Sequence, residues 1–232
     1  MLRVWLGSLG LLVVVVLLWA AAPPHRPRIV GTPEPPPPYT TRRVFADVLL
    51  KSPVYVASHC RHAGLLVAEL GGVIRRLHDG KAYPFLVEKD LEFYGFTFHP
   101  KYADNGQLFV FANGPISAKS RRNQIFRYLV KPGSQEVDPT TRTLILEWPS
   151  NGHNGGDLAF GPDGLLYISS GDGSSDSDEG NTGQDLRDLT SGIVRIDVDR
   201  PAPGQAYSIP RDNPFLHLKE ARGELWAFGL RN

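Results

Sequence analysis

The sequence predicts an all-β protein that forms part of a β-propeller, and repeated hairpins are the main evidence. Residues 158–169 hold a short apolar strand, the turn Pro162-Asp163-Gly164 and a second apolar strand. Residues 96–111 repeat this scheme with an Asn-Gly turn, and residues 53–76 repeat it with a Gly-Gly break before a third strand. Self-similar antiparallel sheets without long amphipathic helices are typical of propeller blades. A β-sandwich with Gly- and Pro-containing turns is the alternative.

The N-terminal residues 1–22 are predicted to be a signal peptide or an N-terminal membrane anchor. Arg3 precedes an apolar run at residues 11–18, and three alanines at residues 20–22 are the small residues that an export peptidase requires. Residues 4–22 are about long enough to span a bilayer, so a membrane tether is the alternative to cleavage. Both possibilities predict an exported protein, either periplasmic or extracellular.

The rest of the chain divides into a linker and a folded region. Residues 23–42 are rich in proline, which favours an extended, semi-rigid spacer. Residues 43–232 are predicted to form the partial propeller, with an entry strand at residues 44–50. About 190 residues would make three to four blades of four strands each.

Composition excludes some classes of partner. The 232 residues carry a net charge of +1, which indicates no polyanionic partner, so nucleic acid binding is not expected. The single cysteine, Cys60, cannot form an internal disulfide and is predicted to be a buried or partly buried thiol.

His153 is the candidate catalytic residue within the Gly- and Asn-rich segment that precedes the strand at residues 158–160. A histidine at the end of a strand, among residues that let a ligand approach closely, points to function more than to core packing. The other histidines near turns have no acidic or histidine neighbours at metal-ligand spacing. We therefore expect solvated side chains at His59, His62 and His78, and a structural role at His99. Carboxylates in residues 172–181 suggest calcium, but the glycine and glutamate positions of an EF-hand are missing, so a flexible acidic loop is expected and no metal site is assigned.

Several ordered motifs resemble the glucose/sorbosone dehydrogenase family. They lie at residues 151–172, 183–199, 212–215 and 224–232, and the resemblance covers roughly residues 44–232. The family includes soluble quinoprotein glucose dehydrogenases and aldose sugar dehydrogenases, which are six-bladed propellers that use pyrroloquinoline quinone (PQQ). The resemblance therefore implies that about the N-terminal half of such a propeller is present, and this chain is expected to be an inactive N-terminal fragment.

The resemblance also implies roles for individual residues. His153 matches the general base, while Arg231 and Asn232 match an Arg-Asn pair that contacts the quinone. Gly152 and Asp90 depart from the family, which has an acidic residue and a glutamine there; the first change puts glucose selectivity in doubt, and Asp90 is not expected to contact the cofactor.

The function implied for the complete protein is PQQ-dependent oxidation of an aldose sugar to its lactone, with an external electron acceptor. Calcium is a second implied cofactor, with ligands expected beyond residue 232. The alternative is a non-catalytic extracellular propeller that binds a protein or a glycan.

Overall fold

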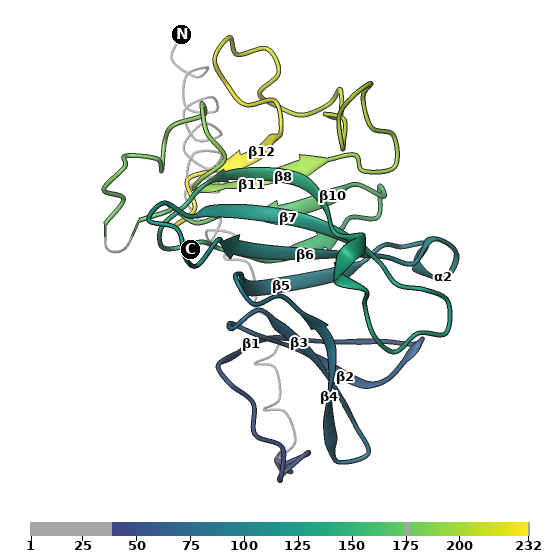
Figure 1. Cartoon of the computed structure of the whole chain (residues 1–232). Coiled ribbons are helices and arrows are strands. Elements are labelled where there is room, and N and C mark those ends of the chain that lie inside the picture. Colours follow the sequence, from purple (N-terminus) through teal and green to yellow (C-terminus); the bar gives the residue numbers. More distant parts are fainter. Residues whose placement is uncertain (1–38, 175–176, 232) are drawn as a thin grey trace, which may run out of the picture. The chain divides into compact units, whose positions relative to one another are not determined.

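Three four-stranded antiparallel sheets make up most of the regular structure (Figure 1). The computed structural model describes residues 39–174 and 177–231. The first sheet contains β1 (Pro53–His59), β2 (His62–Glu69), β3 (Val73–His78) and β4 (Lys81–Val87) in that order. The second contains β5 (Glu92–Phe98), β6 (Gln107–Gly114), β7 (Arg122–Leu129) and β8 (Thr143–Pro149) in that order. The third has the order β12-β11-β10-β9, from β9 (Leu158–Phe160), β10 (Leu166–Ser169), β11 (Gly192–Ile196) and β12 (Leu225–Phe228).

Each sheet is a simple meander in which strands consecutive in sequence pair with each other. This is the blade pattern that the hairpin repeats predicted. Only two short helical elements accompany the sheets in the described residues, α2 (Tyr102–Asn105) between β5 and β6, and the 3-10 turn η1 (Pro139–Thr141) between β7 and β8.

The predicted hairpin turns form where the sequence allows a left-handed backbone. Gly106 and Gly164 lie in the connections β5–β6 and β9–β10, with φ of +64° and +78°. Residues with a Cβ rarely adopt such angles, so glycine is the natural choice at these turns.

The chain separates into two units, Met1–Arg42 and Arg43–Asn232. The predicted targeting segment at residues 1–22 lies outside the described residues, as does most of the linker at residues 23–42. Among the residues that are described, no helix has the length and apolar character needed to cross a membrane.

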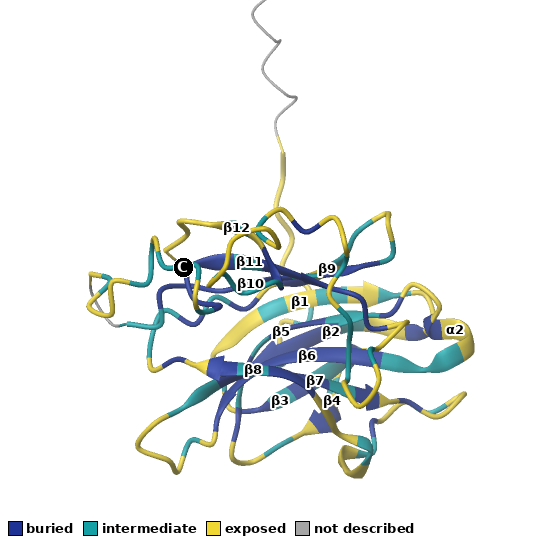
Figure 2. Ribbon diagram, turned by 90° about the horizontal axis from the view of Figure 1, so that it is seen from above, coloured by how far each residue is buried: buried dark blue, intermediate teal, exposed yellow. Residues whose placement is uncertain are grey.

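Two apolar layers hold the three sheets together, and the middle sheet contributes to both (Figure 2). On β6, Leu108 and Val110 face the first sheet, whereas Phe109 and Phe111 face the third. This alternation follows from the two-residue period of a strand, and it explains why β6 reads as a continuous apolar run: the strand is buried on both faces. The β5–β8 sheet therefore positions the loops of the sheet that follows it.

Replacement of Phe111 tests the packing between the second and third sheets. Its side chain is fully buried and makes edge-to-face contacts with Tyr94 and Trp148, at ring-centroid distances of 6.0 and 5.7 Å. Phe111→Ala is expected to lower the free energy of unfolding by about 3–5 kcal/mol, because it removes the ring and leaves a cavity between two sheets. Urea denaturation measures the loss. Leu129→Ala, at a side chain that is 43% exposed, is the control and should change stability by less than about 1 kcal/mol. Equal effects of the two changes would contradict the described core.

Two sequence predictions are wrong. Residues 44–50 do not form an entry strand but contain turns and bends, and Phe45 has a positive φ of 54°. The segment is β-rich in composition, yet most of its side chains are exposed, so it has no sheet face to pack against. Cys60 is exposed instead of buried, because it lies in the tight β1–β2 turn.

Candidate active site

His153 lies in the connection between β8 and β9, close to the start of β9. Its φ of +31° is unusual for a residue with a Cβ, so the surrounding contacts must hold the backbone in this conformation. The side chain is 22% exposed, which leaves the imidazole accessible while fixing its direction.

Asp172, in the segment that follows β10, contacts the imidazole at the same open end of the β9–β10 hairpin. The Nδ1 atom of His153 lies 3.0 Å from Oδ1 of Asp172, whose side chain is only 2% exposed. A carboxylate accepts hydrogen bonds, so this contact places the proton on Nδ1 of a neutral His153 and leaves the Nε2 lone pair for another group. The pair has the arrangement of a general base and the group that orients it.

The Asp172 carboxylate is kept ionised by its hydrogen bonds. Burial alone would raise its pKa, but the backbone N–H and the hydroxyl of Ser174 both donate to Oδ1, each at 2.9 Å, and His153 adds to their effect. The balance lowers the pKa of Asp172 below its usual value. A negative charge therefore faces His153 at neutral pH.

Backbone contacts bring Arg231 to the same place. The Asp172 N–H donates to the Arg231 carbonyl at 2.8 Å, and the Gly173 N–H donates to the His153 carbonyl at 3.3 Å. Residues 171–173 thus lie between the His153 segment and the chain after β12. The structure brings together two of the residues that the sequence singled out, His153 and Arg231, although they are far apart along the chain.

Gly171 is required for this close approach. A Cβ at this position would lie 2.0 Å from the His153 carbonyl oxygen and 2.7 Å from that of Arg231. Gly171→Ala is therefore expected to displace one of these segments and to lower the free energy of unfolding by about 1–3 kcal/mol. Thermal denaturation measures the effect. Gly71→Ala is the matched control, since a Cβ there meets nothing within 4 Å, and a similar loss in both variants would contradict the packing around residue 171.

A buried group of amides and hydroxyls fixes the loop that carries His153. Asn154 accepts hydrogen bonds at Oδ1 from Ser150 and Asn113, at 2.5 and 3.2 Å, and its amide donates to the Tyr94 hydroxyl at 2.8 Å. Asn123 donates to the Asn154 carbonyl at 3.0 Å. Hydrogen bonds among buried polar side chains favour one conformation of a loop, so this network positions the neighbouring histidine.

The outer part of the site carries further charged and polar groups. Arg121 pairs with Glu92 at 3.0 Å, and its backbone N–H donates to the Asn151 side chain at 2.9 Å. Tyr94 donates to Glu92 at 3.3 Å. These contacts link the β5–β8 sheet to the loop before β9, and the sequence analysis did not identify them.

The other residues discussed in the sequence analysis differ in where they lie. Asp90 lies outside the site and binds Ser117, accepting from its N–H and hydroxyl at 3.0 and 2.9 Å. Asn232 lies outside the described residues. The interpretation of residues 172–181 as a flexible acidic loop is wrong for Asp172, which is buried against His153. Asp178 also has a defined role, since its carboxylate accepts from the N–H groups of Thr182 and Gly183 at 2.6 and 2.9 Å.

A cavity of about 480 Å³ lies beside Asp172, lined in part by Trp148, Ser150, Asp188 and Thr190. It is adjacent to the His153–Asp172 pair, although His153 does not line it. Within residues 39–174 and 177–231, no group of three or more His, Cys, Asp or Glu side chains is arranged to hold a metal ion.

Residues 53–232 match the profile of the family described as Glucose / Sorbosone dehydrogenase. The chain belongs to this family. Among solved structures, the chain resembles a putative oxidoreductase (glucose dehydrogenase) from Thermus thermophilus, with a TM-score of 0.65 and 26% identity over 79% of this chain and 53% of that one. It also resembles the PQQ-bound aldose sugar dehydrogenase from Streptomyces coelicolor, with a TM-score of 0.60 and 24% identity over 79% of this chain and 52% of that one. The β-propeller prediction is thereby confirmed.

Curated relatives of this chain include proteins that are not named as dehydrogenases. The HIPL1 protein of Arabidopsis thaliana is 32% identical over 223 residues, which cover 73% of this chain and 32% of that protein. The Hedgehog-interacting protein of Mus musculus is 36% identical over 147 residues, which cover 59% of this chain and 21% of that protein. The chain thus spans a third or less of these relatives and about half of the matched structures.

Proposed function

We propose that the full-length protein that contains this chain oxidises an aldose sugar to its lactone, with PQQ as the hydride acceptor. The observation that carries the proposal is the His153–Asp172 pair at 3.0 Å, with the Arg231 segment bonded to the same aspartate. A positioned base close to a segment that carries an arginine suits the removal of a proton from a sugar hydroxyl beside an anionic cofactor.

In this proposal, His153 takes the proton of the anomeric hydroxyl on Nε2. The C1–H bond breaks with its electron pair, and the C1–O bond becomes the carbonyl of the lactone. When bound, PQQ supplies the quinone that accepts the hydride. Asp172 stabilises the imidazolium that forms, because its carboxylate faces Nδ1 and stays ionised.

The residues present fit such a cofactor on one side. Arg231 is exposed beside the His153 segment, and a guanidinium pairs well with the carboxylates or quinone oxygens of PQQ. Arg231 and Asn232 are proposed to contact the cofactor. We also propose that the full-length protein uses calcium as a second cofactor and passes its electrons to an external acceptor. The protein is proposed to be exported, either with cleavage of the N-terminal segment or with residues 4–22 as a membrane tether.

Binding of PQQ tests the role of Arg231. Arg231→Ala is expected to weaken PQQ binding by about tenfold or more and to lower turnover as well, because a charge-assisted contact is lost. Arg231→Lys is expected to restore only part of the affinity, since a point charge does not reproduce the planar fork. Fluorescence titration of the full-length protein with PQQ measures the affinity. Unchanged affinity in Arg231→Ala would remove this residue from the cofactor site.

A binding function is the second candidate, and the likeness to the Hedgehog-interacting protein favours it. Gly152 agrees with it, because the carboxylate expected next to the catalytic histidine is missing. In this case the protein would be a non-catalytic extracellular propeller that binds a protein or a glycan. The absence of aldose-dependent turnover in the PQQ-loaded full-length protein would favour this candidate.

A further inference from the structure

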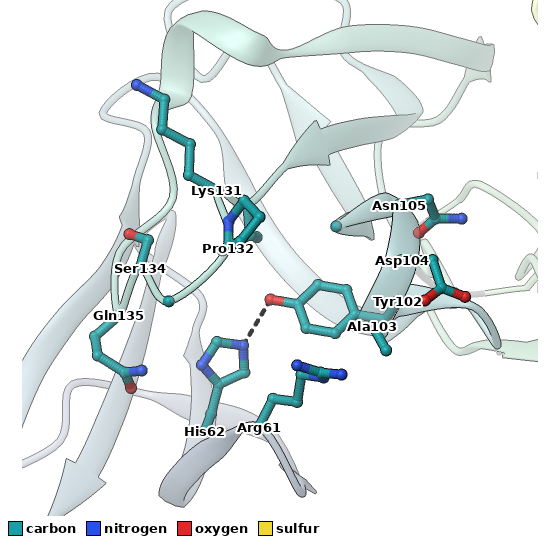
Figure 3. A pocket seen from close by; sticks show the side chains of 13 residues that line it. Arg61, His62, Tyr102, Ala103, Asp104, Asn105, Lys131, Pro132, Ser134 and Gln135 are labelled. Carbon is teal, nitrogen blue, oxygen red and sulfur yellow. Dashed lines mark hydrogen bonds between the residues drawn. The ribbon is translucent and has the colours of Figure 1, made fainter.

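The cavity drawn in Figure 3 has a volume of about 270 Å³ and lies between the β1–β2 turn, α2 and residues 130–135. His62 lines it but is only 5% exposed, so the expectation of a solvated His62 is wrong. Its Nε2 lies 2.6 Å from the Tyr102 hydroxyl, on the side of the ring where Arg61 also lies. Nδ1 lies on the other side of the ring, towards Gln135, so Arg61 and Nδ1 do not converge on one ligand.

A different cavity, of about 420 Å³, lies where the first strands of the three sheets meet. β5 contacts both β1 and β9, and the wall of the cavity includes Tyr55 of β1, Tyr94 of β5 and residues 155–157 before β9. The volume falls in the range of about 300–1,000 Å³ that is typical of small-molecule sites. This cavity shares no lining residue with the cavity beside Asp172, so a ligand here would leave the proposed catalytic pair accessible.

Among the described residues, Asp157 is the only charged one that lines this cavity. The residue is exposed, and its backbone N–H donates to the Ser169 hydroxyl at 3.1 Å. Its carboxylate makes no hydrogen bond or ion pair with any residue in the ranges 39–174 and 177–231. A carboxylate without a counter-charge gives the cavity a negative potential, which attracts cations.

Two tyrosine rings supply aromatic surface. Tyr55 packs edge-to-face against Phe96, with ring centroids 5.2 Å apart, and this contact fixes its ring. Tyr94 is fixed by its hydroxyl, which accepts from the Asn154 amide at 2.8 Å. A Cβ at Gly156 would lie only 2.3 Å from the Cβ of Tyr94, so the backbone of the β9 side packs directly against this tyrosine.

Asp157 and Tyr55 act on each other across the cavity. Burial raises the pKa of the Tyr55 hydroxyl, and the negative charge of Asp157 raises it further, so this hydroxyl keeps its proton at neutral pH. Arg121 is a cation near Tyr94, but it is paired with Glu92 at 3.0 Å and lines no part of the cavity. The charge of Asp157 is therefore available to a ligand.

We propose that this cavity binds a small organic ammonium ion, with the Asp157 carboxylate as its counter-charge and the tyrosine rings as its aromatic wall. Aromatic rings attract cations through the negative potential of their faces, and a nearby carboxylate adds an ion pair. A quaternary ammonium group suits an open cavity of this kind, because it is weakly hydrated and offers alkyl surface to the rings. This inference does not depend on the proposed dehydrogenase activity.

The test uses choline as the probe and the full chain labelled with ¹⁵N, with the backbone amide signal of Gly156 as the report from the cavity wall. Saturable shifts with a Kd on the order of 1–10 mM are expected, because one ion pair and contacts with aromatic rings drive binding. The neutral isostere of choline, in which a tert-butyl group replaces the trimethylammonium group, is expected to bind at least about tenfold more weakly.

Variants of the two proposed contacts complete the experiment. Asp157→Asn removes the counter-charge at an exposed position, and Tyr55→Leu removes a ring; each is expected to weaken choline binding by about threefold to fivefold. Tyr55→Phe keeps the ring, and Asp47→Asn changes an exposed carboxylate that does not line the cavity, so both should bind choline normally. Thermal denaturation checks that each variant is folded, and Asp157→Asn carries the test if Tyr55→Leu is not. No saturable binding, equal binding of the neutral isostere, or unchanged binding in Asp157→Asn would overturn the proposal.

Discussion

His153→Ala is expected to lower aldose turnover of the PQQ-loaded full-length protein by about a hundredfold or more, while PQQ still binds. The change removes the proton acceptor but leaves the Arg231 segment, which is bonded to Asp172 through its backbone. Steady-state rates with an artificial electron-accepting dye give the loss in turnover. A PQQ titration of the same variant shows that the cofactor site is intact.

The control for this variant is His217→Ala, at an exposed histidine outside the site. It should keep both turnover and PQQ affinity. Near-normal turnover in His153→Ala with any aldose would show that another group is the base.

Asp172→Asn is expected to lower turnover by about 10- to 100-fold, the range found when a group that orients a functional histidine is lost. The amide is nearly the same size as the carboxylate but carries no charge, and it can present an N–H to Nδ1 of His153. The histidine would then favour the tautomer with its proton on Nε2, where the proposed reaction needs a lone pair.

The pH dependence separates this role from simple packing. Because the pKa of Asp172 is lowered in the folded protein, its charge and its contribution to stability are present at neutral pH and are lost only as the pH falls through that lowered pKa. In Asp172→Asn no ionisable carboxyl remains at this position, so the acidic limb that reports loss of the Asp172 charge should be missing from the pH profile of kcat/KM. Asp47→Asn, at an exposed carboxylate, is the control. An unchanged pH profile in Asp172→Asn would contradict the role proposed for the carboxylate.

The blades could be predicted from the sequence because their turns have a strict chemistry. Glycine at Gly106 and Gly164, next to alternating apolar residues, marked the hairpins correctly. Residues 44–50 misled the prediction, because β-forming composition alone does not provide a neighbouring strand. Burial of His62 could not be read from its place beside a turn, since it depends on aromatic side chains from other strands, such as Phe85 and Phe98.

The candidate site was predicted in part. His153 stood out because of its Gly- and Asn-rich surroundings, but Asp172 was grouped with the acidic residues that follow it. The pairing register of the β9–β10 hairpin indicates that Asp172 lies close to His153. Leu158 pairs with Ile168 and Phe160 with Leu166, and continuing this antiparallel register towards the N-terminus places His153 opposite Gly173, next to Asp172. The buried network around Asn154 could not be found in this way, because it joins residues from different sheets.

Dye reduction by the full-length protein, measured with PQQ, calcium and a panel of aldoses, tests the central claim most directly. We expect turnover that requires both PQQ and an aldose, and that is lost in His153→Ala but retained in His217→Ala. A wild-type protein that binds PQQ yet shows no aldose-dependent turnover would contradict it.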